Sequence, residues 1–249
     1  MTPEFPPPYV PLAELDRALS DTGFALLDSA SVSRWLAATP AEWRDLQQAW
    51  DELPPDEYLK DGGRYRKRRH SCFVVDGERV DLVPHRAHWQ PVEYNALHGG
   101  MQRWFQPMLP QTLALPLWQR LLVRLGEAAS ALRGTQPWYT EAHTFRIDTA
   151  GGIGRPTPEG AHRDGVDLVA VFLVARQGIK GGESRVFEAH GPRGQRFTLQ
   201  EPWSLLLLDD QRVIHETTPI QPAVPDAYGW RDTLVVTCRA GGFPGDRTG

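Results

Sequence analysis

Apolar residues recur at helical spacing in the first half of the chain and in short strand-like runs in the second half. Helices are predicted over Leu12–Leu19 and from about Ser31 to Glu52, with a short strand at Phe24–Leu27 between them. The most regular helical pattern runs from Leu115 to Leu132, and Gly134 follows it as a natural C-terminal cap. The stretch from Asp56 to Asn95 is predicted to be irregular, with short strands around Ser71 to Val75, so the first half is helical and mixed.

After Gly134 the chain consists of short apolar runs separated by turn signals such as Gly181-Gly182. The predicted strands are Glu141–Asp148, Val166–Ala175, Glu183–Glu188, Gln195–Leu199, Ser204–Leu208, Arg212–Thr217 and Thr233–Arg239. Short strands at this spacing are typical of sandwiches and barrels, jelly rolls included. We therefore predict one α+β, mainly β domain over residues 1–249, in which a helical and mixed support region (1–135) backs a jelly-roll core (136–240).

Composition narrows the classes of partner. The 249 residues carry 27 basic and 31 acidic side chains, and a net charge of −4 gives no reason to expect a nucleic-acid partner. One short basic run, Arg64–His70, is interpreted as a solvated face or loop. The two cysteines, Cys72 and Cys238, lie in no metal-binding pattern and are expected to be buried free thiols.

The chain shows no sign of a membrane or export segment. Its longest apolar run, Leu168–Ala175, is far too short to span a bilayer. The first residues, Met1 to Pro8, lack the basic and apolar parts of a signal peptide. We expect a cytoplasmic protein with no membrane contact, and the sequence does not indicate its oligomeric state.

Gly160-Ala161-His162-Arg163-Asp164-Gly165 contains the first candidate metal ligands. In an extended strand, residues two apart point to the same face, so His162 and Asp164 can offer a nitrogen and an oxygen to one ion. The flanking glycines allow sharp turns around them. Alone, the motif also fits a surface histidine beside a turn aspartate.

A second segment supplies a third candidate ligand. An apolar strand and an Asp-Asp turn precede a short strand with His215 near its end. Two histidines and one carboxylate that leave three positions open form the facial triad of non-haem Fe(II) oxygenases. A lone histidine is often a satisfied buried side chain, but His215 follows His162 by a gap that suits two pieces of one barrel.

Arg231 opens the final apolar strand. A guanidinium gives a permanent charge and a planar fork that pairs with a carboxylate. At the mouth of a barrel it would suit the distal carboxylate of 2-oxoglutarate, whereas on the surface it would pair with Asp232 or Glu216.

These pieces resemble a known family when they are taken together. The segments Thr157–Gly165, Gly181–Ser184, Asp209–Ile220 and Arg231–Val236 resemble the bacterial Fe(II)- and 2-oxoglutarate-dependent dioxygenases that include L-isoleucine 4-hydroxylase, with relatives tied to biofilm formation and stress tolerance. The resemblance covers residues 136–240 well and the earlier part loosely.

The resemblance implies a double-stranded β-helix, the jelly-roll barrel also found in cupins. It implies that His162, Asp164 and His215 bind Fe(II), that Arg231 anchors 2-oxoglutarate, and that O₂ is consumed. The substrate would be a free L-amino acid that is hydroxylated, or oxidised at sulfur for methionine, with release of succinate and CO₂.

Further co-substrate and substrate contacts are expected near the triad. Alternation along the strand at Glu141–Ile147 favours His143 near the co-substrate, with Arg146 on the other face as the rival. Thr233 points with Arg231 and is expected to share the distal carboxylate. Possible partners for the carboxylate and ammonium of an amino acid are Arg66, Arg68, Gln90 and Asn95.

Other readings stay open at this stage. The substrate could be a peptide, a protein side chain or another metabolite. The chain could instead be a non-catalytic protein that binds metal or 2-oxoglutarate in stress or biofilm signalling, although an intact triad and Arg231 argue against that. A cupin-like protein with another divalent metal would have no need for Arg231.

Overall fold

A long antiparallel sheet runs through the centre of the molecule. The computed structural model describes residues 5–95 and 97–246. Seven strands pair in the order β1-β9-β5-β12-β4-β2-β3. Their bounds are β1 Phe24–Leu27, β2 Arg66–Asp76, β3 Arg79–Leu82, β4 Trp138–Asp148, β5 Leu168–Gln177, β9 Ser204–Asp209 and β12 Trp230–Arg239.

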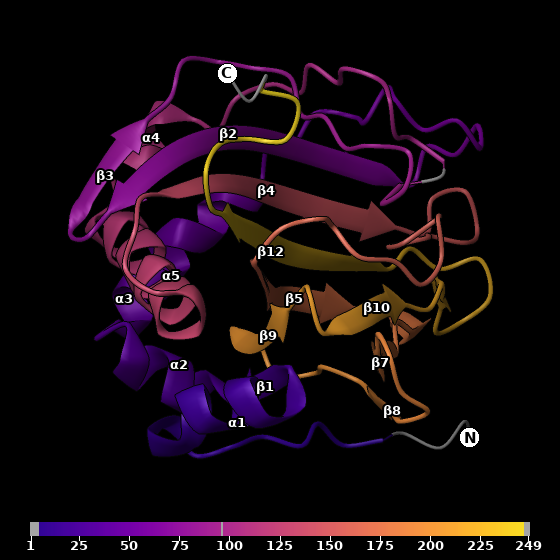
Figure 1. The fold of residues 1–249 in the computed structure, drawn as a ribbon. Helices are drawn as coiled ribbons and strands as arrows, with labels where there is room; N and C mark the ends of the chain where they lie inside the picture. Colours follow the sequence, from indigo (N-terminus) through magenta and orange to yellow (C-terminus); the bar gives the residue numbers. More distant parts are fainter. Residues whose placement is uncertain (1–4, 96, 247–249) are drawn as a thin grey trace.

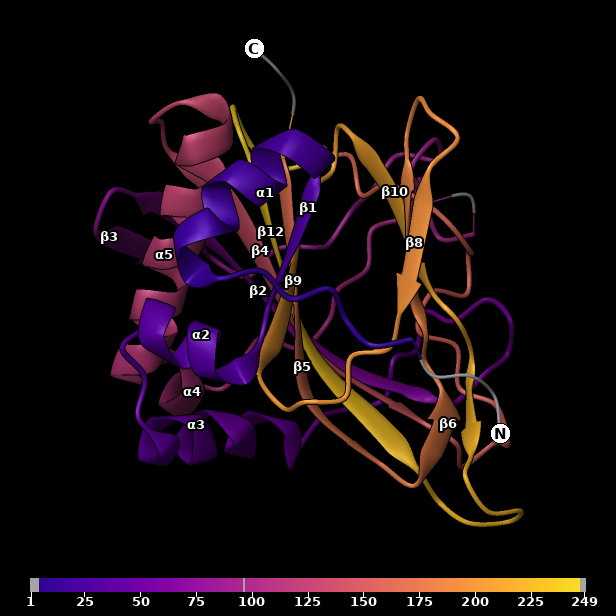
Figure 2. The ribbon, with the colours of Figure 1, turned by 90° about the horizontal axis from the view of Figure 1, so that it is seen from below.

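Smaller sheets cover one face of this large sheet, and helices cover the other (Figures 1 and 2). The smaller sheets pair β10-β7-β8 and β11-β6. Their strands are β6 Ile179–Gly181, β7 Ser184–Glu188, β8 Gly194–Phe197, β10 Val213–Thr217 and β11 Ile220–Pro222. The predicted jelly-roll fold with helical support is confirmed, and each predicted strand is present within a few residues of its expected bounds.

The helical layer is more divided than the sequence suggests. Its elements are η1 Leu12–Glu14, α1 Leu15–Thr22, α2 Ser29–Trp35, α3 Pro40–Gln47, η2 Gln48–Trp50, α4 Pro110–Leu113 and α5 Pro116–Arg133. The prediction of one helical zone from Ser31 to Glu52 is wrong, because α3 begins anew at a capping box in which Thr39 and Glu42 satisfy each other's backbone N–H groups. The helix predicted over Leu115–Leu132 is confirmed as α5, with Gly134 after it.

The main core lies between the helices and the large sheet. Leu117, Leu121 and Leu125 on α5 are fully buried, and burial of each such side chain contributes about 1.5–3 kcal/mol. Trp43 of α3 stacks on Trp203 with ring centroids 4.3 Å apart. This packing makes the large sheet a rigid support whose other face is free to build a pocket.

The basic run Arg64–His70 was interpreted as solvated, and this is wrong. Most of it belongs to β2, where Arg66, Arg68 and His70 are only 6, 3 and 1% exposed. These side chains alternate with outward-facing ones, as a strand requires. Their charges are tolerated inside because Arg66 pairs with Asp56, whose Oδ2 lies 2.7 Å from Arg66 Nε.

Two further expectations can be compared with the structure. Cys72 and Cys238 are buried free thiols, as predicted. Within the described residues, every helix lacks the length or the apolar character needed to cross a bilayer.

Candidate functional site

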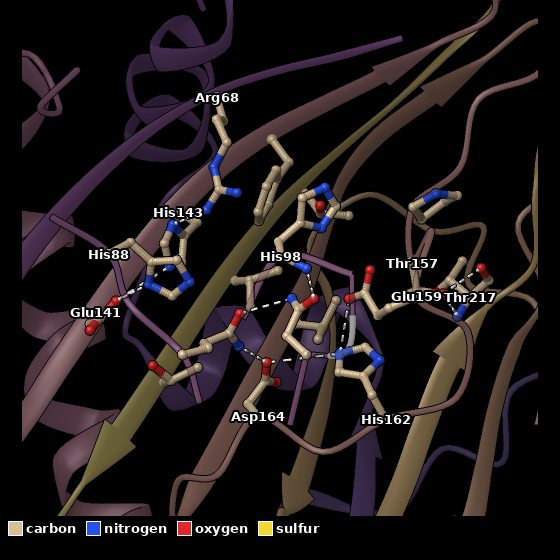
Figure 3. A pocket seen from close by; sticks show the side chains of 18 of the residues that line it. Arg68, His88, His98, Glu141, His143, Thr157, Glu159, His162, Asp164 and Thr217 are labelled. Carbon is tan, nitrogen blue, oxygen red and sulfur yellow. Dashed lines mark hydrogen bonds and ion pairs between the residues drawn. The ribbon is translucent and has the colours of Figure 1, made fainter. Parts of the chain in front are cut away.

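A cavity of about 140 Å³ lies on the face of the large sheet opposite the helices. Inward-facing residues of β2, β4 and β12 form its floor, and the long connection from β3 to α4 forms part of its wall. His162, Asp164 and His215 lie together in this cavity (Figure 3 labels the first two). The cavity is therefore where the candidate ligands and the interior charges meet.

The candidate ligand atoms converge without bonding to one another. His162 Nε2 lies 3.8 Å from Asp164 Oδ1, and His215 Nε2 lies 3.7 Å from Asp164 Oδ2. Both distances are too long for hydrogen bonds. Two nitrogens and a carboxylate thus face a common point, which is the donor set that Fe(II) accepts in facial-triad enzymes.

Backbone pairing fixes the two histidines relative to each other. His162 and His215 exchange both N–H···O bonds, at 3.0 and 2.9 Å. His162 Nδ1 lies 2.9 Å from the carbonyl oxygen of Gly160, so this nitrogen donates and Nε2 keeps its lone pair. The motif was expected in a strand, but the structure has a loop with this single bridge, because turns at Gly160 and Gly165, with φ of 81° and 77°, interrupt any longer pairing.

Asp210 holds the loop that carries Asp164. Its carboxylate accepts hydrogen bonds from the backbone N–H groups of Asp164, Gly165 and Val166, at 3.0, 2.7 and 3.1 Å. Asp210 lies in the turn between β9 and β10, so the same residue ties this loop to the strand of His215. Burial and the nearby Asp164 carboxylate raise the pKa of Asp210.

The electrostatics of the three side chains favour a cation. Burial, helped by the neighbouring His162, lowers the pKa of His215 to about 3, so its imidazole is neutral. Burial raises the pKa of Asp164. For His162, burial acts to lower the pKa, but the carboxylates of Asp164 and Glu159 outweigh it and raise the value. A divalent ion would compensate the buried carboxylate directly.

Gln90 connects Asp164 to the loop above it. Its Nε2 donates to Asp164 Oδ1 at 3.1 Å, while its Oε1 accepts from Asn95 and Arg103 at 3.0 and 2.9 Å. The amide orientation follows from these partners, because only the oxygen can accept from two donors. Gln90 and Asn95, which the sequence indicated as possible substrate contacts, thus line the pocket. Gln90 bonds to a candidate metal ligand, and Asn95 bonds to Gln90.

Arg231 and Thr233 face the cavity from β12. Arg231 is 3% exposed, and its Nε and Nη2 atoms have no hydrogen-bond partner among the residues that the structure describes. Burial and the nearby Arg176 lower its pKa to about 10, which leaves it charged at neutral pH. A buried, charged and incompletely paired guanidinium has free donors that a carboxylate could accept.

Arg146 was expected as a possible co-substrate ligand, but the structure does not bring it to the cavity. Its guanidinium pairs with both oxygens of Asp232, at 2.8 and 2.6 Å, and lies over the Trp230 ring. Strand alternation explains this position, since Arg146 and His143 project from opposite faces of β4.

His143 does line the cavity, within a second group of histidines around Glu141 (Figure 3). Glu141 Oε2 lies 3.0 Å from His70 Nε2 and 2.5 Å from His88 Nδ1. Arg68 Nη2 lies 2.6 Å from His143 Nδ1, so that nitrogen accepts and Nε2 carries the hydrogen. We call these four residues, His70, His88, Glu141 and His143, the Glu141 cluster.

Several pocket residues were not assigned a role from the sequence. Glu141, His88, His98, Arg103 and Glu159 all line the cavity. Alternation in Arg66-x-Arg68-x-His70 was a usable signal for β2. No local pattern marks His88 or Arg103, because the connection that carries them has little regular structure.

Comparisons with known proteins agree with this geometry. The family model described as 2OG-Fe dioxygenase matches residues 47–237. The crystal structure of a bsmA homolog from Methylobium petroleophilum PM1 is 53% identical over 94% of this chain and 95% of that chain, with a TM-score of 0.89. No curated protein matches the chain.

More distant structures share the fold. IDO from Bacillus thuringiensis has a TM-score of 0.74 at 19% identity, over 91% of this chain and 98% of that chain. The Fe(II)/α-ketoglutarate-dependent dioxygenase TqaL has a TM-score of 0.72 at 18% identity, over 92% and 86%. The family match covers most of the chain, and the converging His, Asp and His side chains fit the metal of that family. The chain therefore belongs to the 2OG-Fe dioxygenase family, whose enzymes use Fe(II), 2-oxoglutarate and O₂.

Proposed function

We propose that this dioxygenase hydroxylates a free L-amino acid, or oxidises it at sulfur if the substrate is methionine, and releases succinate and CO₂. The observation that carries the proposal is the single small cavity in which the candidate triad and several incompletely paired guanidinium groups meet. A small polar substrate beside a dicarboxylate co-substrate would satisfy those groups.

In this proposal His162, Asp164 and His215 hold Fe(II). His162 and His215 offer Nε2, and Asp164 offers the carboxylate between them. When bound, the iron and 2-oxoglutarate activate O₂ and supply the oxidising chemistry. The protein contributes orientation, because Gly160 fixes the ring of His162 and Gln90 fixes the carboxylate of Asp164.

Arg231 and Thr233 would hold the distal carboxylate of 2-oxoglutarate. The two unpartnered nitrogens of Arg231 offer donors, and Thr233 follows on the same face of β12. His143, predicted near the co-substrate, is assigned a supporting role because its Nδ1 already accepts from Arg68.

The lining of the cavity favours a small charged substrate such as a free amino acid. Charged side chains from β2, β12 and the β3–α4 connection all face it. The resemblance of the motif segments to the family of L-isoleucine 4-hydroxylase adds support for an amino acid. The distant likeness to IDO concerns the fold alone.

Anaerobic loading with Fe(II) followed by O₂, 2-oxoglutarate and a panel of L-amino acids tests the proposal. We expect at least one amino acid to stimulate succinate formation and to be recovered with one added oxygen. Succinate formation that no amino acid stimulates would reject it and favour a peptide or another metabolite. Binding of metal and 2-oxoglutarate without any turnover would instead favour the non-catalytic signalling role.

A further inference from the structure

Among the described residues, several arginines that line the cavity have buried donors without an acceptor, Arg66 and Arg103 among them. Arg66 on β2 and Arg103 on the β3–α4 connection are 6% and 2% exposed. Arg66 Nη2 and Arg103 Nε are buried and lack a hydrogen-bond partner. A buried N–H without a partner is destabilising, so unpaired donors on two cavity-lining guanidinium groups indicate a missing acceptor.

The charges around these donors are also unbalanced. Asp56 pairs with Arg66 at 2.7 Å and lies 3.7 Å from Arg68, so one carboxylate serves two arginines. Arg103 donates to the neutral amide of Gln90 at 2.9 Å, and no carboxylate among the described residues forms an ion pair with it. Burial and the nearby Arg66 lower the pKa of Arg103 to about 10, which keeps it charged at neutral pH. The missing acceptor is therefore an anion.

One carboxylate oxygen in the same cavity also lacks a hydrogen-bond partner among the described residues. Glu159 Oε2 is buried and accepts no hydrogen bond, and Glu159 Oε1 lies 3.5 Å from His162 Nε2. Glu159 influences the charge of Arg103 electrostatically, yet among the described residues no ion pair joins it to Arg103 or Arg66. Figure 3 shows Glu159 beside His162, on the side of the cavity away from Glu141.

We propose that Arg66 and Arg103 bind the α-carboxylate of the substrate and that Glu159 binds its α-ammonium group. The inference rests on the proposed function and narrows it to amino acids in which both groups are free. An amide, an N-acyl derivative or an internal peptide residue would leave one of these buried charges unpaired, which the site would reject strongly.

This anion site is separate from Arg231. Arg66 pairs with Ile147 across β2 and β4, and Ile147 pairs with Arg231 across β4 and β12. Two strand spacings put the two backbones roughly 10 Å apart. Ile147 lies between the two arginines in the register, so we assign Arg66 to a carboxylate of the substrate and Arg231 to one of the co-substrate.

Binding measurements on the Mn(II)-loaded full chain test the assignment. The wild-type protein would be titrated calorimetrically with 2-oxoglutarate and, in its presence, with L-amino acids. Arg66→Gln and Arg103→Gln are expected to weaken binding of the amino acid about 10- to 100-fold each, with 2-oxoglutarate affinity changed less than about twofold. Arg231→Gln is expected to weaken binding of 2-oxoglutarate and to leave the affinity for the amino acid nearly unchanged.

Arg69→Gln serves as the matched control. Arg69 lies on β2 between two inward residues but bonds outward, to the Glu52 carbonyl and to Gln106. It should leave both affinities unchanged.

Ligand analogues make the test independent of how well the variants fold. Wild-type protein should bind the amino acid at least about tenfold more tightly than its amide or its N-acetyl derivative. Glu159→Gln should weaken binding of the amino acid and leave binding of the matching 2-hydroxy acid unchanged.

The outcomes separate this inference from the proposed function. Wild-type turnover of an amino acid with affinity unaffected by Arg66→Gln and Arg103→Gln would overturn the inference alone. The inference alone would also be overturned if the amide bound as tightly as the amino acid, or if these variants lost affinity for 2-oxoglutarate instead. A wild-type chain that binds no L-amino acid would overturn both.

Discussion

Two groups of histidines and carboxylates share one cavity, and they differ in how their hydrogen bonds are arranged. In the triad the facing atoms stand 3.7 and 3.8 Å apart, and His162 Nε2 keeps its lone pair. In the Glu141 cluster two of the contacts are 3.0 and 2.5 Å, and the histidine nitrogens that face Glu141 carry hydrogens. Residue types alone would mark both as metal sites. The hydrogen bonds distinguish a group whose ligand atoms face one another unbonded from a group whose carboxylate already accepts from two histidines.

The largest expected effect separates the two groups by metal content. His215→Ala should lose more than about 100-fold in iron affinity and abolish succinate formation, because one of three ligands is removed. His88→Ala in the Glu141 cluster should retain one iron per chain. Iron content after anaerobic loading and desalting measures both, and comparable losses would mean that the Glu141 cluster also binds metal.

A smaller effect is expected one step away from the iron. Gln90→Ala removes the donor to Asp164 and should reduce turnover about 10- to 100-fold. Gln211→Ala is the matched control, since Gln211 donates to Asp167 instead, at 2.9 Å. Initial rates of succinate formation compare them, and equal rates for the two variants would remove Gln90 from the mechanism.

The Glu141 cluster should matter mainly for stability. Glu141→Gln replaces the ionised acceptor of two buried histidine N–H groups and should cost about 1.5–3 kcal/mol of unfolding free energy with iron content unchanged. Glu127→Gln, which breaks an exposed pair with Arg124 on α5, should cost less than about 1 kcal/mol. Urea denaturation measures both, and a Glu141→Gln chain as stable as wild type would contradict the structural role.

The smallest effect is a dependence of stability on pH. Burial lowers the pKa of His88 to about 4, against 6.5 for an unperturbed histidine. Between these values the unfolded chain binds a proton that the folded chain does not, so stability is full above about pH 6.5 and falls as the pH drops towards 4.

From pH 6 to pH 5 this loss should be about 1 kcal/mol from His88 alone. Denaturation at the two pH values should show a shallower decline in His88→Asn than in the wild type. Parallel declines would show that His88 does not titrate in this way.

The structure brings His162, Asp164 and His215 together as the sequence predicted, because these residues lie in two compact segments. His162 and Asp164 need only a local turn, and His215 reaches them through a single backbone bridge. The positions of Arg231 and Thr233 followed in the same way from alternation on one strand.

The part of the cavity around Arg66 and Arg103 was predicted poorly for physical reasons. Arg103 and His88 lie on the irregular connection from β3 to α4. Their positions in the cavity depend on how this connection packs, and a periodic sequence pattern does not predict that. The basic run was interpreted by its composition, although buried arginines are tolerated wherever a carboxylate such as Asp56 is brought to them. The side on which Arg146 lies did not follow from the sequence, because it depends on the ion pair with Asp232 on the other face of the sheet.

Asp210 has a consequence for how the enzyme acquires its metal. Its carboxylate holds three consecutive amides of the Asp164 loop beside the strand of His215, and none of these bonds needs an ion. The site is thus preorganised, and loading need not fold it, in contrast to small zinc domains that are unfolded without metal. Removal of the metal by a chelator and reloading should be freely reversible, because the loop of Asp164 keeps its conformation without the metal.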